Sequence, residues 1–349
     1  MPSLGAREPA IALVLGDPAG IGPELIAKLV ARKDLMSRAR VAVVGDRWLW
    51  QLGQSQAGLV LPLPEIGAWA DLARRPAGAC FFPVETVAPA EITPGASGPA
   101  GGKSALQVLR SCLAAAVRGD IDALCFAPLN KLSLKLAGME FADELHFFAH
   151  ELRVKGFVGE FNILGKLWTA RVTSHIPLRQ VSVAITKERI KEATSRLHSA
   201  LLRAGFSPPR IAVAALNPHA GEGGTCGREE IEIIGPAVEE SRAEGLAVLG
   251  PYPADTLFVR AQAGEFDGIV TMYHDQGQIA MKLMGFRRGV TLQGGLPVVV
   301  TTPAHGTAFE IVGQNRADPG AMIEAYGLAV AMAENTAFSS SKPAISRSA

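Results

Sequence analysis

The sequence contains few cysteines, and their spacing is as informative as their number. Only four occur in 349 residues, Cys80, Cys112, Cys125 and Cys226, and no two of them form a C-x-x-C pair. This small, scattered set argues against a disulfide framework, although Cys226, in a glycine-rich loop, could be a metal ligand. Reduced thiols in apolar surroundings are expected, which favours a cytoplasmic protein.

Long apolar runs and an excess of charge of one sign are also missing. The first apolar run, Ala10–Leu15, ends at Gly16-Asp17-Pro18, too early for a signal peptide, and no later run has the length of a membrane span. The chain carries 34 Lys and Arg against 33 Asp and Glu, a formal net charge of +1, without a basic stripe. We therefore expect neither a membrane nor a nucleic acid as a partner.

The sequence does contain a regular alternation of short β-branched runs and longer helical ones. This pattern predicts an α/β protein with one or two mostly parallel sheets and right-handed crossovers. The expected strands are Ile11–Leu15, Val41–Val44, Ala123–Phe126, Ile211–Ala215, Gly268–Thr271 and Val298–Thr301. The expected helices are Pro23–Ala31, Lys103–Val117, Thr186–Ala204, Arg228–Glu244 and Met322–Ala333. Loops are expected at Thr93–Gly102 and Gly250–Pro253, and disorder in the serine-rich tail Ser339–Ala349.

The glycine-rich loop after the first strand has two interpretations. Its sequence, GDPAGIGPEL at 16–25, resembles the turn of a dinucleotide-binding strand–loop–helix unit. However, the third glycine of the G-x-G-x-x-G pattern would fall on Leu25, and Pro23 suits the first position of a helix. A tight loop that places Asp17 at the mouth of a cleft explains the segment at least as well.

Three histidines, His175, His219 and His274, lie in polar or glycine-rich turns that follow short apolar runs. Each turn is therefore expected at a strand end, where open α/β sheets bind ligands. Imidazole is the commonest ligand for zinc-like ions, and three protein ligands with one open position describe a catalytic metal site. The trio therefore predicts a metal site, although a single histidine is more often an ordinary polar residue.

Other residues suit a cofactor or an acidic substrate. Glycines in the 214–230 loop let backbone amides approach a phosphate or carbonyl, and small residues in 305–313 leave room for a planar ring such as adenine. Lys282, eight residues after His274, can act as an acid or base or hold a carboxylate. Arg287 can bind a carboxylate with two hydrogen bonds, but a solvated basic face explains it equally well.

Taken in order, these segments resemble the 4-hydroxythreonine-4-phosphate dehydrogenase family. The motifs are GDPAGIGPEL (16–25), APLNK (127–131), ALNPHAGEGG (215–224), PADTLF (253–258), MYHDQG (272–277) and HGTAFEIVG (305–313). The resemblance implies a fold like that of isocitrate and isopropylmalate dehydrogenases, with two α/β/α domains, 1–128 plus 285–349 and 129–284, around a cleft. It also implies a homodimer whose subunits share the active site, a small-molecule substrate, NAD, and a divalent metal, for which three imidazoles favour zinc.

The resemblance also assigns roles at the matching positions. His175, His219 and His274 would hold the metal, while Lys282 and Asp255 would act in catalysis. The cofactor would contact two loops, through Asn217, Gly221, Glu222 and Gly223 in the first and His305, Gly306, Thr307 and Asn315 in the second.

Departures from the family pattern bear on the substrate. The family's Gly-His-Thr-Glu is replaced by Asp143-Glu144-Leu145-His146, an asparagine by Thr291, and a phosphate-binding arginine by Val300. Losing the arginine removes charge-assisted hydrogen bonds, and the new carboxylates would repel a phosphate. The substrate is therefore expected to contact Asp143, Glu144, His146, Arg287, Thr291 and Val300. This favours the terephthalate dihydrodiol dehydrogenase branch, in which NAD-dependent oxidation of a cis-dihydrodiol dicarboxylate with decarboxylation gives 3,4-dihydroxybenzoate.

Three alternatives remain open. The substrate is instead 4-hydroxythreonine 4-phosphate, or a related phosphorylated hydroxy acid, if other basic residues rebuild the phosphate pocket. A non-catalytic metal- or ligand-binding protein on the same scaffold is disfavoured because Lys282 is retained together with all three histidines. Acyl transfer, known for phosphate acyltransferases of the same general fold, would not need a three-histidine site.

Overall fold

The computed structural model describes residues 8–338, so the predicted disordered tail 339–349 lies outside the described residues. The chain divides into two compact units, unit 1 (1–158 and 290–349) and unit 2 (159–289). The first boundary falls thirty residues later than the sequence indicated, since α6 (Lys131–Leu136) and α7 (Glu144–Glu151) belong to unit 1. Their buried residues Leu134, Leu145 and Phe148 are part of its hydrophobic core.

Unit 1 is built on a sheet with the strand order β3-β2-β1-β4-β11-β10. All neighbours are parallel except β10, which runs antiparallel to β11. The strands are β1 (Ala10–Val14), β2 (Arg40–Gly45), β3 (Gly78–Pro83), β4 (Ala123–Phe126), β10 (Val290–Gly294) and β11 (Val299–Pro303). β2 and β3 lie on one side of β1, and the next strand along the chain, β4, lies on its other side. The strand order therefore reverses direction at β1. This topological switch point is where ligands bind in open α/β sheets.

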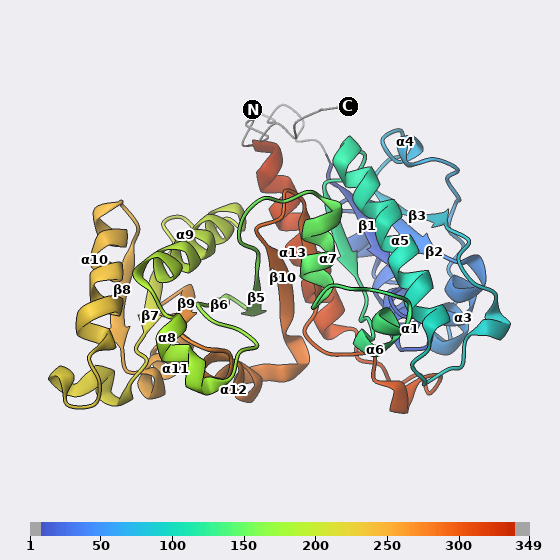
Figure 1. Ribbon diagram of the computed structural model, residues 1–349. Coiled ribbons are helices and arrows are strands. Elements are labelled where there is room, and N and C mark those ends of the chain that lie inside the picture. The colour runs from blue at the N-terminus through green and yellow to red at the C-terminus, as the bar shows by residue number, and fades with distance from the viewer. Residues whose placement is uncertain (1–7, 339–349) are drawn as a thin grey trace, which may run out of the picture. The chain divides into compact units, whose positions relative to one another are not determined.

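Helices cover both faces of the unit 1 sheet (Figure 1). On one face, α5 (Pro99–Arg118) packs into the core cluster that contains Val300. The next residue of β11, Thr301, points the other way and donates from Oγ1 to the Ala325 carbonyl of α13 (Gly320–Phe338) at 2.9 Å. Alternating side-chain direction along β11 therefore places α5 and α13 on opposite faces. The remaining helices of this unit are α1 (Gly22–Val30), α2 (Lys33–Met36), α3 (Arg47–Ala57) and α4 (Trp69–Leu72).

Unit 2 has its own sheet, in the order β5-β6-β9-β7-β8. β5 (Gly159–Leu164) and β6 (Leu167–Arg171) form an antiparallel hairpin, while β9 (Gly268–Thr271), β7 (Ile211–Ala214) and β8 (Val248–Tyr252) continue parallel to β6. Its helices are α8 (Val181–Ala184), α9 (Lys187–Arg203), α10 (Gly235–Ala243), α11 (Ala254–Gln262) and α12 (His274–Gly285). The predicted α/β class is confirmed in both units.

All six predicted strands are present. The prediction of a loop at Gly250–Pro253 was wrong. Residues up to Tyr252 instead continue β8, and the Gly250–Pro251 peptide bond is cis. Proline, which has no N–H for a sheet ladder, is tolerated here because β8 is the edge strand of unit 2. The expected loop at Thr93–Gly102 also ends early, since α5 begins at Pro99.

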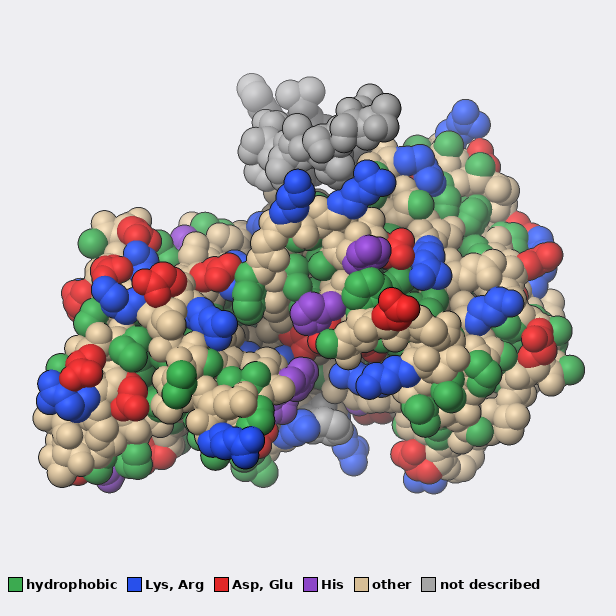
Figure 2. All heavy atoms as spheres, viewed as in Figure 1, with side chains coloured by type: hydrophobic (Ala, Val, Ile, Leu, Met, Phe, Trp, Pro, Cys, Tyr) green, Lys and Arg blue, Asp and Glu red, His purple; other side chains and the backbone are tan. Residues whose placement is uncertain are grey.

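The surface agrees with the balanced charge of the sequence. Acidic and basic side chains are interspersed over each unit on the face shown in Figure 2, and neither sign forms a broad patch there. Within residues 8–338, every helix is too short or too polar to cross a membrane.

Candidate active site

The four parallel strands of unit 2 end at one edge of the sheet, and each is followed by a predicted functional residue. His175 follows β6, His274 follows β9 as the first residue of α12, and His219 follows β7. Asp255 follows β8 in the first turn of α11. The sequence pattern therefore placed all three histidines correctly at strand ends, on three neighbouring strands.

Two of the histidines lie beside each other. The ring centroids of His175 and His274 are 5.5 Å apart, with a tilt of 42° between the planes. Two imidazoles on one tetrahedral ion, with metal–nitrogen bonds of about 2.0–2.1 Å, would have centroids roughly 5 Å apart. Asp275 Oδ1 lies 2.7 Å from His274 Nδ1. An imidazole that donates from Nδ1 to a carboxylate keeps its lone pair on Nε2, the arrangement common in metal-binding histidines. The pair therefore fits a divalent ion.

His219 does not join this pair within one chain. No group of three His, Cys, Asp or Glu side chains suited to an ion is found among residues 8–338. His219 lies in a left-handed turn in which five consecutive residues, 219–223, have φ between 43° and 80°. Left-handed backbone costs a non-glycine residue about 1–2 kcal/mol, and such strain is typical of functional sites. His175 also has a positive φ, of 48°.

A buried carboxylate holds the His219 loop in this shape. Glu230 Oε1 accepts hydrogen bonds from the backbone N–H groups of Leu216 and Asn217, both at 2.8 Å, and its Oε2 accepts from Asn217 Nδ2 at 2.9 Å. A Cβ on Gly221 would come within 2.7 Å of Glu230 Oε2, so only glycine fits there. The side-chain amide of the predicted cofactor residue Asn217 thus donates to Glu230 within the loop. The predicted cofactor residues Glu222 and Gly223 are exposed.

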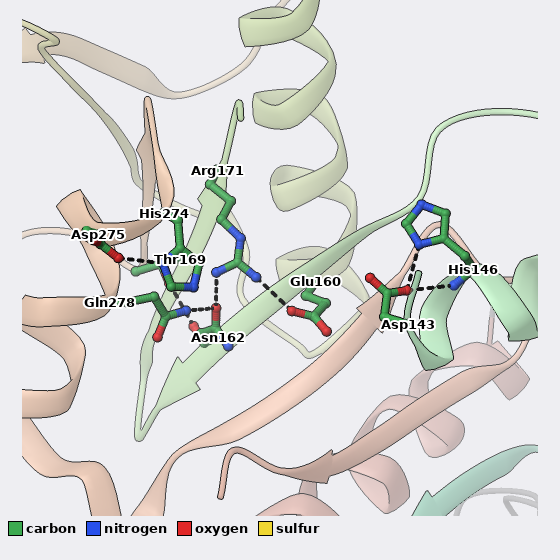
Figure 3. Close-up of polar contacts among 9 residues, drawn as sticks. All are labelled: Asp143, His146, Glu160, Asn162, Thr169, Arg171, His274, Asp275 and Gln278. Carbon is green, nitrogen blue, oxygen red and sulfur yellow. Dashed lines mark hydrogen bonds and ion pairs between the residues drawn. The ribbon is translucent and has the colours of Figure 1, made fainter. Parts of the chain in front are cut away.

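The first nine residues of α12 place three polar side chains on one face. His274, Gln278 and Lys282 are spaced four residues apart, so they lie in a row along the helix. Gln278 donates to Asn162 on β5, a contact drawn in Figure 3. Lys282, the predicted catalytic lysine, therefore lies on the same helix face as the predicted metal ligand His274.

The matching edge of the unit 1 sheet carries a buried acid. Asp17 follows β1, is 1% exposed, and accepts a hydrogen bond from the Ala19 N–H at 2.8 Å. Burial raises the pKa of Asp17, although hydrogen bonds from Ala19, Ser133 and Asn130 partly offset this effect. Asp17 is therefore buried within unit 1, with Ser133 and Asn130 among its hydrogen-bond partners.

The predicted NAD segment follows β11 and is fastened to α1 and to the loop before it. The Ile21 N–H donates to the Thr307 carbonyl at 3.1 Å, and a Cβ on Gly20 would lie 2.9 Å from Thr307. At the far end, Glu24 Oε1 accepts from the Ala317 N–H at 2.9 Å. Lys28 Nζ donates to Glu24 Oε1 and to the Ala317 carbonyl, both at 2.8 Å. This ion pair fixes one end of the segment that contains His305, Gly306 and Asn315.

The predicted substrate residues have varied environments. Asp143 is the N-cap of α7, and its Oδ1 lies 2.9 Å from the His146 N–H and 2.6 Å from His146 Nδ1 (Figure 3). Burial raises the pKa of Asp143, but the His146 hydrogen bonds and nearby positive charge outweigh it and leave the pKa below its usual value. Val300 is fully buried in the unit 1 core with Leu145. Thr291 is buried in β10, and Arg287 is exposed.

A pocket lies at the opposite edge of the unit 2 sheet, away from the histidines. It is lined by residues that precede the parallel strands, among them Lys166, Phe206 and Arg210. Arg210 forms a fork with Asp267, at 3.1 and 2.8 Å, so its charge is already compensated. The three predicted metal ligands and Asp255 lie at the other edge of this sheet.

Comparison with known proteins identifies relatives over nearly the whole chain. The family model described as "Pyridoxal phosphate biosynthetic protein PdxA" matches residues 37–329. A Pseudomonas aeruginosa protein provisionally named 4-hydroxythreonine-4-phosphate dehydrogenase 2 is 47% identical, with 94% of this chain and 98% of that protein covered. D-threonate 4-phosphate dehydrogenase of Pectobacterium atrosepticum is 37% identical, with coverage of 93% and 99%. The crystal structure of 4-hydroxythreonine-4-phosphate dehydrogenase from Klebsiella pneumoniae has a TM-score of 0.81 at 35% identity, with coverage of 95% and 100%.

The expected cis-dihydrodiol dicarboxylate substrate was wrong. Terephthalate 1,2-cis-dihydrodiol dehydrogenase from Burkholderia xenovorans is a more distant neighbour, with 28% identity, a TM-score of 0.66 and coverage of 93% and 98%. Closer relatives carry the names of enzymes for phosphorylated substrates. The expectation rested on the arginine replaced by Val300 together with the carboxylates of Asp143 and Glu144. Val300 points into the hydrophobic core, so this position says nothing about groups elsewhere that can bind a phosphate.

Proposed function

The chain belongs to the PdxA family and is a dehydrogenase, an oxidoreductase that acts on a secondary alcohol, and from this we propose that it oxidises a 4-phosphorylated hydroxy acid with NAD and a divalent metal. The substrate class is that named in its relatives, 4-hydroxythreonine 4-phosphate or D-threonate 4-phosphate. The observation that carries the proposal is the adjacent pair His175 and His274 at the carboxyl edge of the unit 2 sheet.

The residues of this chain divide the work of the reaction. His175 and His274 would hold the metal, with the Asp275 carboxylate orienting the His274 ring. When bound, the metal would act as a Lewis acid toward the substrate hydroxyl, and NAD would accept the hydride. Lys282, on the same face of α12 as His274, would take the hydroxyl proton or hold the substrate carboxylate. The segment 305–315 would bind NAD on the support that Glu24 and Lys28 provide.

A second copy of the chain would complete the metal site with its His219. One chain brings two of the three histidines together, and several of the apolar side chains that follow those two are exposed. Leu178, shortly after His175, is 71% exposed, and Leu283 on α12 is 84% exposed. Exposed apolar residues around an incomplete site are typical of a subunit interface.

Mixing two inactive variants tests this shared site. His219→Ala and His274→Ala should each abolish turnover. Co-refolded in equal amounts, they would form mixed dimers with one complete site, because one copy supplies His175 and His274 and the other His219. Random pairing then restores about a quarter of wild-type activity. If no activity returns although mixed dimers form, the third ligand does not come from the second copy.

Steady-state assays of NAD reduction test the substrate class. D-threonate 4-phosphate and 4-hydroxythreonine 4-phosphate should be compared with unphosphorylated D-threonate, each with added divalent metal. We expect turnover with at least one of the two phosphates and a much lower kcat/KM without the phosphate group. Equal kcat/KM for D-threonate and its 4-phosphate would contradict the proposed class.

A further inference from the structure

A polar network joins β5, β6 and α12 beside His274. The Arg171 guanidinium on β6 donates from Nη2 to Glu160 Oε2 at 2.7 Å and from Nη1 to Asn162 Oδ1 at 2.9 Å. The Arg171 side chain is only 10% exposed. Figure 3 shows Arg171, Asn162 and Gln278 meeting close to the His274 ring. None of these residues belongs to a motif in the sequence.

Asn162 is the centre of this network. Its Oδ1 accepts hydrogen bonds from both Arg171 and Gln278, and its backbone carbonyl accepts from Thr169 Oγ1 at 3.2 Å. Gln278 lies between His274 and Lys282 on the same face of α12. The hydrogen bond from Gln278 therefore connects the middle of this face of α12 to β5. Arg171 in turn connects β5 to β6.

We propose that Arg171, Asn162 and Gln278 are positioning residues that fix the face of α12 from which His274 and Lys282 act. The inference rests on the proposed function, since it takes His274 as a metal ligand. A largely buried ion pair is a costly way to join two strands, because apolar side chains do so without desolvating charges. A fully satisfied polar network instead specifies one geometry. Here that geometry sets the position of α12 relative to β6, the strand that leads to His175.

The ion pair with Glu160 disfavours direct binding of a substrate phosphate by Arg171. Its charge is compensated by Glu160 at 2.7 Å, so a phosphate would meet a nearly neutral pair. A merely structural role would affect folding alone, whereas a positioning role also predicts effects on metal affinity and turnover.

Isothermal titration calorimetry of Co²⁺ binding to the metal-free protein distinguishes a positioning role from a merely structural one. Gln278→Met removes the donor to Asn162 with little change in volume. We expect about a tenfold loss in Co²⁺ affinity, in the range for groups that support metal ligands, together with a lower kcat and an unchanged KM for NAD. Asn162→Asp keeps an oxygen that accepts from Arg171 and Gln278, so it should retain more affinity than Gln278→Met.

The matched control is Arg210→Met, compared with Arg171→Met. Arg210 is paired with Asp267 at 2.8 Å in the same unit, but at the opposite edge of the sheet. Arg171→Met should reduce Co²⁺ affinity and kcat, while Arg210→Met, at a side chain that is 53% exposed, should leave both unchanged. If Arg171→Met fails to fold, Gln278→Met decides.

The possible results distinguish the two proposals. If the wild-type protein binds no Co²⁺, the proposed metal site fails, and the positioning role fails with it. If the wild type binds Co²⁺ and Gln278→Met matches it in affinity and kcat, only the positioning role is overturned. Equal losses in the two arginine variants also overturn it, because they would reflect general destabilisation.

Discussion

The buried pair Glu24 and Lys28 offers a sharp test of how the predicted NAD segment is supported. Glu24 is completely buried, and Lys28 keeps 20% of its side chain exposed. Glu24→Ala removes a charged acceptor from the Ala317 N–H, which costs about 1.5–3 kcal/mol, and loses the ion pair, worth about 1 kcal/mol for a partly exposed partner. We therefore expect a loss of roughly 3 kcal/mol in the free energy of unfolding. Glu24→Gln keeps an acceptor for Ala317 and should cost only the ion pair.

Variants of Lys28, the charge partner of Glu24, provide a second test, because their stability losses should not add to those of the Glu24 variants. Lys28→Met leaves the Glu24 carboxylate buried without its counterion, a change that costs about 3–5 kcal/mol. Combining Glu24→Gln with Lys28→Met removes both charges, so the double variant should be more stable than the sum of the single losses predicts, by about 1–2 kcal/mol.

Urea unfolding followed by tryptophan fluorescence measures these losses. Three of the four tryptophans, Trp48, Trp50 and Trp69, lie in unit 1, the unit that contains the pair. Losses below 1 kcal/mol for Glu24→Ala, or strict additivity in the double variant, would refute the reasoning. If the segment binds NAD, Glu24→Ala should also raise the KM for NAD more than it lowers kcat.

Three further outcomes are expected. The raised pKa of Asp17 means that its ionisation costs stability, so the wild type should lose stability relative to Asp17→Asn as the pH rises from 4 to 7 in thermal unfolding; a constant difference would contradict this. Burial raises the thiol pKa of Cys80 to about 11 and of Cys125 to about 12, so iodoacetamide at pH 8 should label Cys226 first, as mass spectrometry can show. Glu230→Gln should loosen the His219 loop and speed tryptic cleavage after Arg228; wild-type cleavage rates would argue against a Glu230 clamp.

The sequence predicted the positions of the functional turns better than their assembly. His175, His219 and His274 each follow a short apolar run, and a parallel strand ends before each turn because such runs are the buried strands of α/β sheets. The strands β5 and β6 were missed, since their mixture of polar and apolar residues gives no continuous apolar run.

Long-range partners left no local trace. Asn162 and Gln278 are 116 residues apart, and Glu24 and Ala317 are 293 apart, so no pattern within either segment predicts their contact. Val300 illustrates the opposite difficulty. A change of residue type was visible in the sequence, but the direction of the side chain, which decided its meaning, depended on the face of β11 that packs against α5.

The interrupted course of unit 1 has a consequence for how the protein is made. β11 pairs with β4 across more than 170 intervening residues, and it separates β4 from β10 in the sheet. All strands of unit 2 leave the ribosome before β10 and β11 do, so the inserted unit is the first to have its full set of strands. Until then β4 is an open edge with unsatisfied backbone groups, exposed to pairing with another chain. During synthesis, unit 1, whose first strands are made before those of unit 2, is therefore the unit at risk of pairing with another chain.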